Sequence, residues 1–391
     1  MSTNKHTNPA YISHVHLKGY KSIIDTEVEL HPGLNIIIGP NGSGKTNFLE
    51  FLKRIITRNL PKDTVEFYLE IVTKKEKQIW EGYVNEPKEN PKTQEFEIIV
   101  SDRIYSISQK KPKFKSNYHS HYGTVIYGDK KLHDLLPNFY PISFISFSIP
   151  KTISGLTDNI NLTINKKNFK ASLADLDLDS SIKFIGDFIL NNFYYKKLSP
   201  EILSSKDNIL NDANLSEVLI RNLNKFSPIK NLRLESGLSV KENGLAYYIN
   251  HINFEFFVNE NWINWNMMSD GTKRLFYLIS EVTLKKGLCF IEEPEIGVHP
   301  NQYRRILNFL KEQSEDKQII ITTHAPKTLD ILNDSELDRI ILTRYDNLLG
   351  TKMRHLNKEE IKHAVKYMLK ESLFLSDFWT LTSFFDEEEI I

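Results

Sequence analysis

Residues 34–56 read LNIIIGPNGSGKTNFLEFLKRII, and three patterns follow one another in this stretch. Leu34–Ile38 is an apolar run rich in β-branched residues, which is typical of a buried strand. Residues 39–46 match the pattern G-x-x-x-x-G-K-[ST], and the apolar residues that follow, from Phe48 to Ile55, recur at helical spacing. A strand, a glycine loop and a helix in this order predict a phosphate-binding loop in an α/β fold.

The chemistry of phosphate binding explains the residues of this loop. Gly42 and Gly44 allow backbone N–H groups to turn around phosphate oxygens without a Cβ in the way. Lys45 can reach the β- and γ-phosphates, and the hydroxyl of Thr46 can bind Mg²⁺. We therefore expect ATP and Mg²⁺ to be bound here. The expected nucleotide-binding residues of the loop are Asn41, Gly42, Ser43, Gly44, Lys45 and Thr46.

A second apolar run ends in two carboxylates, within GLCFIEEPEIGVHP. Leu288 to Ile291 is a predicted strand, and Glu292 and Glu293 lie at its carboxyl end, where open α/β sheets place their ligands. One such carboxylate can join the coordination shell of Mg²⁺, and the next can polarise an attacking water. A strand that merely ends at an acidic surface is the weaker alternative downstream of a phosphate-binding loop.

A third predicted strand, Ile319 to Ile321, is followed by His324 in the sequence QIIITTHAPKTLDIL. A histidine at the end of an inner strand can form a hydrogen bond with a γ-phosphate or with the attacking water. A lone histidine is usually structural or exposed. The order of glycine loop, acidic strand and histidine favours a functional role for His324.

Residues 267–282, MMSDGTKRLFYLISEV, predict a buried helix with a polar beginning. Ser269 is a preferred N-cap residue, and Leu275, Leu278, Ile279 and Val282 repeat at helical spacing. The plain interpretation is an ordinary capped helix. Alternatively, the bare helix tip at Ser269 and Gly271 is an anion site, because a helix N-terminus attracts negative charge.

Together these motifs resemble those of the ABC-type ATPase fold shared by chromosome-maintenance (SMC), recombination (RecF) and OLD-like proteins. GPNGSGKT resembles their Walker A motif, IEEPE their Walker B motif with the catalytic glutamate, SDGTKR a divergent signature motif, and TTHAP the switch-histidine loop. EPEIGVHP is most similar to the stand-alone OLD-like ATPases of abortive-infection, restriction-linked and Septu-type anti-phage systems. The resemblance is specific over residues 10–60 and 250–345.

The resemblance implies a role for each of these residues. Glu292 would hold Mg²⁺ together with Thr46, and Glu293 would be the general base, acting with Lys45 and His324. Ser269 and Gly271 would contact the nucleotide of a second subunit, so the resemblance implies a homodimer with composite ATP sites.

The sequence departs from the family pattern at two places. The family usually has Asp at the position of Glu292, and no glutamine occurs in residues 142–155, where the family carries its Q-loop. We therefore expect slow turnover, because one extra methylene shifts a carboxylate by about a bond length.

The predicted fold class is an α/β P-loop NTPase of ABC type with an antiparallel β lobe and an inserted helical arm. Residues 1–60 and 240–345 would form a discontinuous ATPase core. Residues 61–150 alternate polar and apolar, as in FYLEIV, FEIIV and ISFIS, and predict the antiparallel lobe. Residues 151–239 would be the helical insertion, with a helical pattern from about 160 to 235. Residues 346–391 would be a C-terminal tail that packs on the core.

Composition limits the class of protein. The chain has 391 residues, with 50 Lys plus Arg and 50 Asp plus Glu, so net charge gives no global attraction to nucleic acid or membrane. Its one cysteine, Cys289, lies in a predicted strand and excludes an intrachain disulfide. We find no signal peptide and no apolar run long enough to cross a bilayer, so we expect a cytoplasmic protein without membrane contact.

Some patterns suggest other sites on weaker grounds. Residues 175–186, DLDLDSSIKFIG, begin like a calcium loop but lack its central Gly and final Glu. Their D-x-D also lacks the context of a metal nuclease, and His119 and His121 have metal spacing without clear partners. Residues 110–122, KKPKFKSNYHSHY, could bind DNA or RNA, although a solvated lysine loop is favoured. The acidic end DEEEII suggests a solvated tail or a contact for a partner.

The leading hypothesis is an ATP-gated homodimer that controls a separately encoded effector, a nuclease or toxin, in anti-phage defence. The first alternative is a DNA-repair ATPase that clamps DNA. The second is an ATP-bound interaction module that does not hydrolyse ATP. A transporter subunit is the least favoured, because SDGTKR differs from the usual transporter signature.

Overall fold

The computed structural model of the chain divides into two compact units. The first unit comprises Met1–Ser146, Lys285–Glu295 and Leu310–Ile391, and the second comprises Phe147–Leu284 and Ile296–Phe309. The residues that the structure describes are 10–57, 64–74, 76–84, 88–89, 96–106, 112–121, 143–146, 160–167, 171–173, 200–203, 205–212, 216–285, 287–371 and 373–382.

A six-stranded sheet forms the centre of the first unit, with the order β20-β19-β3-β18-β17-β9. Its strands are β3 (Leu34–Ile38), β9 (Ser143–Ser146), β17 (Cys289–Glu292), β18 (Ile319–Thr323), β19 (Ile340–Asp346) and β20 (Gly350–His355). All neighbours are parallel except β19 and β20, which form an antiparallel pair. Strands β3, β17 and β18 are buried along their whole length, as expected for parallel strands covered on both faces.

The register of the parallel strands brings three chain segments to one edge of this sheet. Thr323 of β18 pairs with Ile38 of β3, and Glu292 of β17 pairs with Thr322 of β18. The residues that follow β3, β17 and β18 therefore leave the sheet side by side. This is the edge at which open α/β sheets bind ligands.

A second sheet in the first unit is antiparallel, with the order β2-β1-β4-β5-β7-β6 and β8 paired to β7. Its strands are β1 (Tyr11–Tyr20), β2 (Ile23–Glu29), β4 (Val65–Val72), β5 (Lys77–Val84), β6 (Lys88–Glu89), β7 (Phe96–Ser106) and β8 (Pro112–His121). Strand β4 is buried at alternate positions, so one face of the sheet is apolar.

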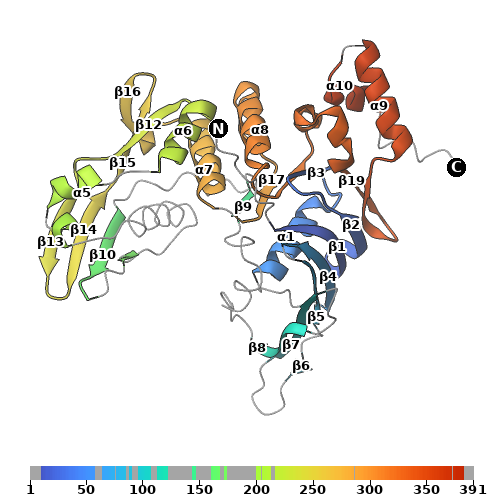
Figure 1. Cartoon of the computed structure of the whole chain (residues 1–391), viewed down its shortest axis with the longest axis horizontal. Coiled ribbons are helices and arrows are strands. Elements are labelled where there is room, and N and C mark those ends of the chain that lie inside the picture. Colours follow the sequence, from blue (N-terminus) through green and yellow to red (C-terminus); the bar gives the residue numbers. More distant parts are fainter. Residues whose placement is uncertain are drawn as a thin grey trace. The chain divides into compact units, whose positions relative to one another are not determined.

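Helix α1 (Lys45–Ile56) lies beside strands of the first unit (Figure 1), and its buried residues belong to a hydrophobic cluster that includes residues of both sheets. Phe48, Leu49, Phe51 and Leu52 are all fully buried, and the same cluster includes residues of β1, β4, β17 and β18. Each such side chain contributes about 1.5–3 kcal/mol through burial. The helix that begins at the predicted phosphate-binding loop is therefore firmly held.

The remaining helices of the first unit lie towards the C-terminus. They are η3 (Pro326–Ile331), η4 (Asp334–Arg339), α9 (Lys358–Glu371) and α10 (Leu375–Thr382). Helix α10 packs on η3 and α9, and β20 contacts β2 of the antiparallel sheet. Helix α8 (Pro300–Gln313) begins in the second unit and ends in the first.

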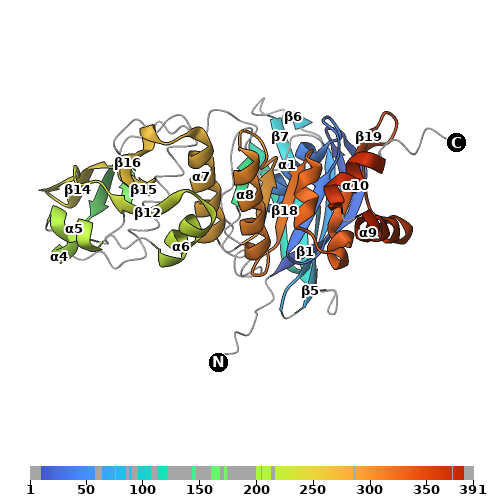
Figure 2. The ribbon, with the colours of Figure 1, turned by 90° about the horizontal axis from the view of Figure 1, so that it is seen from above.

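The second unit contains two small sheets and several helices. The sheets have the orders β11-β10-β14-β13 and β12-β15-β16. The strands are β10 (Ile160–Asn165), β11 (Ala171–Leu173), β12 (Ile229–Leu234), β13 (Ser239–Asn243), β14 (Ala246–Ile252), β15 (Phe254–Val258) and β16 (Asn261–Asn264). The helices are α4 (Pro200–Leu203), α5 (Lys206–Asp212), α6 (Glu217–Phe226), η2 (Trp265–Met267) and α7 (Asp270–Leu284). Helix α6 packs on both α7 and β12 (Figure 2).

Two expectations about secondary structure are wrong. ISFIS does not join the antiparallel sheet, because β9 pairs with β17 in parallel and so completes the central sheet. The helical pattern expected from about residue 160 begins later, because β10 and β11 are strands and β10 pairs with the distant β14. In both cases the deciding partner strand is remote in sequence.

Other sequence predictions remain untested. Residues 175–186 and the acidic end lie outside the described residues, as do the side chains of His119, His121 and residues 110–122. Of residues 142–155, only 143–146 are described. Among the helices that the structure describes, none is both long and apolar enough to span a membrane. The division of the chain into four sequence segments stays a prediction.

Candidate ATP site

The loop of residues 39–46 depends on glycine at specific positions. Gly42 and Gly44 have φ angles of 81° and 95°, a left-handed region that other residues rarely adopt. A Cβ on Gly44 would lie 1.9 Å from Thr351 Oγ1, whereas a Cβ on Gly42 would meet no heavy atom within 4 Å. Gly44 is therefore required both by its backbone and by the close approach of β20.

The two glycines give a matched pair of variants. Gly42→Ala should lower the free energy of unfolding by about 1 kcal/mol through the left-handed backbone alone. Gly44→Ala should cost about 1–3 kcal/mol more, because Thr351 must move. Urea denaturation of both variants measures the difference, and equal losses would contradict the close contact.

Lys45 is buried at the start of α1, with only 5% of its surface exposed. Its Nζ donates hydrogen bonds to the carbonyl oxygens of Gly39 at 2.8 Å and Pro40 at 2.9 Å. Burial lowers the pKa of Lys45 below its ordinary value of 10.5, and the nearby carboxylates of Glu293, Glu295 and Glu292 offset part of that effect. A desolvated cation in this place suits an incoming phosphate.

This lowered pKa predicts a pH dependence of stability. Between the folded-state pKa of Lys45 and 10.5, the folded protein binds fewer protons than the unfolded chain. Burial of the charged Lys45 therefore lowers the free energy of unfolding by its full amount at any pH below the folded-state pKa. This loss disappears as pH rises from the folded-state pKa to 10.5. The free energy of unfolding of wild type minus that of Lys45→Met should therefore increase from neutral pH to about pH 10, as urea denaturation can measure. A constant difference would contradict the desolvation of Lys45.

The hydroxyl of Thr46 donates a hydrogen bond to Oε1 of Glu292, so the helix start and the end of β17 are in direct contact. Glu292 is 5% exposed. A hydroxyl and a carboxylate are the oxygen ligands that Mg²⁺ takes at phosphate sites, where water and phosphate supply the rest. The two residues predicted to bind Mg²⁺ therefore fit it. The Ser43 hydroxyl is also buried in the same loop, with no hydrogen-bond partner among the described residues.

Glu293 follows β17 in a strained conformation, with a φ angle of 47°. Its backbone N–H donates to the Thr322 carbonyl at 2.8 Å, which ties the strained residue to β18. The Glu293 Oε1 atom lies 3.5 Å from Nδ1 of His324, whose side chain is 41% exposed. Strain of about 1–3 kcal/mol is typical of residues held in place for function.

Sequence reasoning missed two residues near this edge. Glu295 contacts the His324 segment, and the repeated Glu in EEPE was the available signal. Lys53 places its Nζ 4.0 Å from the centroid of the Phe144 ring, which connects α1 to β9. Burial lowers the pKa of Lys53, partly offset by Glu50 and Glu292. No local sequence pattern could have indicated that contact.

In the second unit, Ser269 caps α7 as predicted. Its Oγ accepts a hydrogen bond from the Thr272 backbone N–H at 3.3 Å and lies 3.0 Å from the Thr272 hydroxyl. The predicted apolar face is fully buried, with Leu275, Leu278, Ile279 and Val282 all 0% exposed.

Arg274, one turn further along α7, fixes the loop that follows residues 292–295. Its Nη1 donates to the carbonyl of Ile296 at 2.9 Å, and a Cβ on Gly297 would lie 2.9 Å from the guanidinium carbon. Burial lowers the pKa of Arg274, and Asp270 partly offsets this. Gly297, with a φ angle of 68°, therefore allows the arginine to reach the loop.

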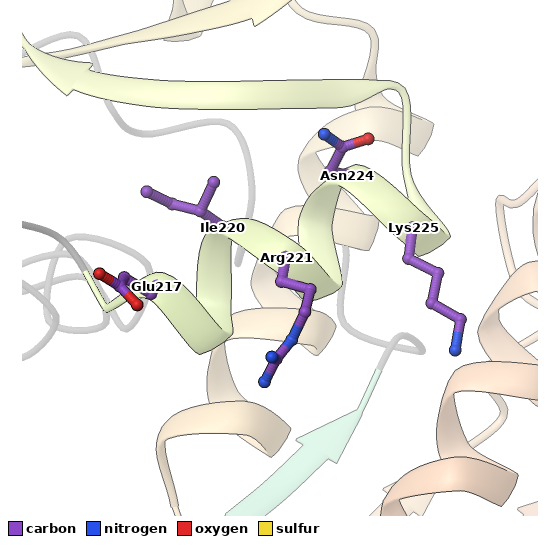
Figure 3. A pocket seen from close by; sticks show the side chains of 5 residues that line it. All are labelled: Glu217, Ile220, Arg221, Asn224 and Lys225. Carbon is purple, nitrogen blue, oxygen red and sulfur yellow. The ribbon is translucent and has the colours of Figure 1, made fainter.

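The structure gathers most of the predicted site residues in the first unit. Lys45, Thr46, Glu292, Glu293 and His324 all lie at the carboxyl ends of β3, β17 and β18. Ser269 and Gly271 belong to the second unit. A shallow pocket in that unit is lined by one face of α6 and includes none of the predicted residues (Figure 3). Its residues are Glu217, Ile220, Arg221, Asn224 and Lys225.

Comparison with known proteins gives one family match and several distant relatives. The model of the family described as "AAA domain, putative AbiEii toxin, Type IV TA system" matches residues 34–330. The DNA replication and repair protein RecF of Streptococcus pneumoniae strain P1031 is 24% identical over 282 residues, which cover 63% of this chain and 75% of that protein. RecF of strain ATCC 700669 is 25% identical over 283 residues, with the same coverage.

Solved structures of SMC head domains are also similar. The SMC head domain from Thermotoga maritima is 14% identical with a TM-score of 0.40, covering 88% of this chain and 99% of that one. The Smc head domain with an extended coiled coil from Pyrococcus furiosus, bound to the C-terminal domain of ScpA, is 15% identical with a TM-score of 0.43. It covers 92% of this chain and 99% of that one.

Proposed function

Because this chain belongs to the AAA-domain family whose model matches residues 34–330, we propose that it is an ATP-dependent switch. Its fold is that of P-loop ATPases of the SMC and RecF type. In this proposal the protein binds ATP, hydrolyses it slowly as a homodimer, and thereby controls a separate effector. That effector is a nuclease or toxin acting in anti-phage defence.

The observation that carries this proposal is the meeting of three chain segments at one edge of the central sheet. Lys45 and Thr46 follow β3, Glu292 and Glu293 lie at the end of β17, and His324 follows β18. The direct Thr46–Glu292 contact and the 3.5 Å approach of Glu293 to His324 connect the segments. A cation, oxygen ligands and a carboxylate base are the groups that hydrolysis of a nucleotide requires.

In the proposed mechanism, the chain positions ATP and activates water. Backbone N–H groups of the glycine loop and Nζ of Lys45 bind the phosphates, and Lys45 exchanges its carbonyl partners for phosphate oxygens. Mg²⁺ held by Thr46 and Glu292 would neutralise phosphate charge. Glu293 accepts a proton from the attacking water, and His324 orients the water or the γ-phosphate.

The homodimer part of the proposal rests on the exposed N-terminal end of α7. Ser269 is exposed and caps the helix, and the neighbouring Gly271 adds no side chain. A helix N-terminus of this kind binds anions. We place the γ-phosphate of a second subunit there. The defence part is supported by the family description, which reads "putative AbiEii toxin, Type IV TA system", and by the EPEIGVHP segment.

Phosphate release tests the catalytic part of the proposal. Wild-type protein incubated with ATP and Mg²⁺ should release phosphate with a low kcat, and Lys45→Ala should reduce release to background. Release by wild type that does not exceed the Lys45→Ala level would contradict hydrolysis and favour an ATP-bound interaction module. A separate experiment tests the effector part of the proposal. Proteins that bind the wild type only when ATP is present are examined for nuclease or toxin activity.

A DNA-repair role is the second candidate, because the relatives with 24–25% identity are RecF proteins of DNA replication and repair. It predicts ATP-dependent binding of duplex DNA whose affinity falls steeply as salt increases. Fluorescence anisotropy with labelled duplex DNA at low and high salt measures this. No binding at low salt, with or without ATP, would exclude the DNA-repair role.

A further inference from the structure

Glu295 occupies a special position between the two chain segments that carry Glu293 and His324. It lies two residues after Glu293, across Pro294, and its side chain is only 12% exposed. Its Oε1 accepts a hydrogen bond from Thr323 Oγ1 at 2.7 Å and another from the His324 backbone N–H at 3.1 Å. The carboxylate therefore fixes the segment after β18 to the segment after β17.

The same carboxylate also faces the imidazole ring. Glu295 Oε1 lies 3.3 Å from Nδ1 of His324, and Glu293 Oε1 lies 3.5 Å from the same nitrogen. Ionised carboxylates accept hydrogen bonds and cannot donate them. Two of them beside Nδ1 thus favour a proton on Nδ1, which leaves Nε2 as the nitrogen available to a nucleotide or a water.

The surroundings keep Glu295 from moving away. Thr323, its partner, accepts a hydrogen bond from the Ala325 N–H at 2.9 Å and lies 3.0 Å from the Thr328 hydroxyl. The second oxygen of Glu295, Oε2, is buried and has no hydrogen-bond partner among the described residues. A carboxylate oxygen that accepts two hydrogen bonds from adjacent residues has few alternative positions, so it can hold a neighbouring ring in one orientation.

We propose that Glu295 is a positioning residue for His324, which fixes the ring orientation and directs the proton to Nδ1. This inference rests on the proposed ATPase function, because His324 matters to turnover only if ATP is hydrolysed. Glu295 itself acts through the ring and does not touch the nucleotide. A purely structural role and an independent role as a second base are the competing explanations.

The first arm of the test is a spectrum of the protein without nucleotide. Nitrogen NMR of ¹⁵N-histidine-labelled protein reports the tautomer of each imidazole, and His324→Ala identifies the His324 signals by their loss. Wild type should show His324 mainly protonated on Nδ1. Glu295→Gln keeps the size of the side chain and an oxygen that Thr323 and the His324 N–H can bind, but it removes the negative charge beside Nδ1, so the Nδ1-protonated share should fall. An unchanged tautomer would overturn the proposal.

The second arm is a double-mutant cycle on turnover. Glu295→Gln should lower kcat about 10–100-fold with little change in KM for ATP, as is typical when a carboxylate that orients a histidine is lost. In the His324→Ala background the same change should cost less than about 2-fold, because residues that act as a unit are not additive. If Glu295→Gln lowers kcat about 10–100-fold in the His324→Ala background as well, Glu295 acts independently of His324, and the proposal is overturned.

A matched control separates positioning from stability. Glu336 is another largely buried glutamate of the first unit, and its Oε2 accepts the Asn333 backbone N–H at 3.0 Å. Glu336→Gln should therefore lower stability without changing kcat or the His324 tautomer. A loss of kcat in Glu336→Gln equal to that in Glu295→Gln would reduce Glu295 to a structural residue.

The two arms keep the two proposals distinguishable. If wild type releases no phosphate above the Lys45→Ala level, the ATPase proposal fails, and the NMR arm alone decides whether Glu295 orients His324. If wild type hydrolyses ATP and Glu295→Gln matches it in kcat, the ATPase proposal stands and the role of Glu295 is contradicted.

Discussion

Glu293→Gln should lower the rate of ATP hydrolysis about 100-fold or more while ATP binding remains close to that of wild type. Glutamine has nearly the same size and keeps the contact distance to His324, but it cannot take a proton from water. The strained backbone at position 293 is unaffected, because the new side chain has the same branching. Single-turnover phosphate release and nucleotide titration measure the two quantities separately.

Glu315→Gln is the control for this experiment, because Glu315 is an exposed glutamate of the first unit that precedes β18, whereas His324 follows the other end of that strand. Its hydrolysis rate should equal that of wild type. If Glu293→Gln hydrolyses ATP within about 3-fold of wild type, Glu293 is not the base, since loss of a general base typically costs 10²–10⁴-fold.

Ser269→Arg should abolish ATP hydrolysis while the affinity of a single subunit for ATP remains unchanged. The reason is that α7 is proposed to bind the nucleotide of the second subunit, and a large side chain at the helix tip blocks that approach. The substitution also removes the cap, in which Ser269 Oγ accepts the Thr272 N–H, at a cost of about 1 kcal/mol in stability. Phosphate release and nucleotide titration on the same sample measure the effect.

Two control variants, Ser269→Ala and Leu245→Arg, separate the loss of the helix cap from the effect of adding an arginine side chain. Ser269→Ala loses the cap and the hydroxyl without adding bulk, so its urea denaturation measures the stability cost of losing the cap. Leu245→Arg adds the same cation at a residue of the second unit that is 79% exposed, and hydrolysis should be normal. Loss of ATP affinity in Ser269→Arg would mean that α7 contacts the nucleotide of its own chain or only caps a helix.

The central sheet and its ligand edge could be predicted because their signals are local. Leu34–Ile38 is the strand β3 as expected, and α1 begins at Lys45 inside the predicted motif. Glycine at positions 42 and 44 was expected to let the backbone turn without a Cβ in the way, and both residues have positive φ angles. The order of Lys45, Glu292 and His324 along three strands then sufficed to predict that they share an edge.

Contacts made by packing could not be predicted in this way. The clash that would meet a side chain at Gly44 comes from Thr351 on β20, about 300 residues away in sequence. The pairing of β9 with β17, and the contact of Lys53 with Phe144, depend likewise on which strand lies beside which. Alternation in ISFIS shows a strand but not its partner.

Glu295 combines a local sequence signal with contacts that only packing determines. The sequence EEPE placed a third carboxylate near the predicted base, but nothing in it indicated that the side chain binds Thr323 and His324. That contact requires β17 and β18 to be neighbours in register, with Glu292 beside Thr322. The sequence could indicate which residues lie at the strand ends, whereas the hydrogen bonds of Glu295 with the segment after the neighbouring strand could not be predicted.

The oligomeric state of Glu293→Gln tests the proposed switch most directly. Light scattering after size-exclusion chromatography should give a monomer mass without nucleotide and a dimer mass with ATP and Mg²⁺, because the variant binds ATP and cannot hydrolyse it. ADP should leave the protein monomeric. A Glu293→Gln protein that binds ATP and stays monomeric at every concentration tested would contradict the ATP-driven homodimer.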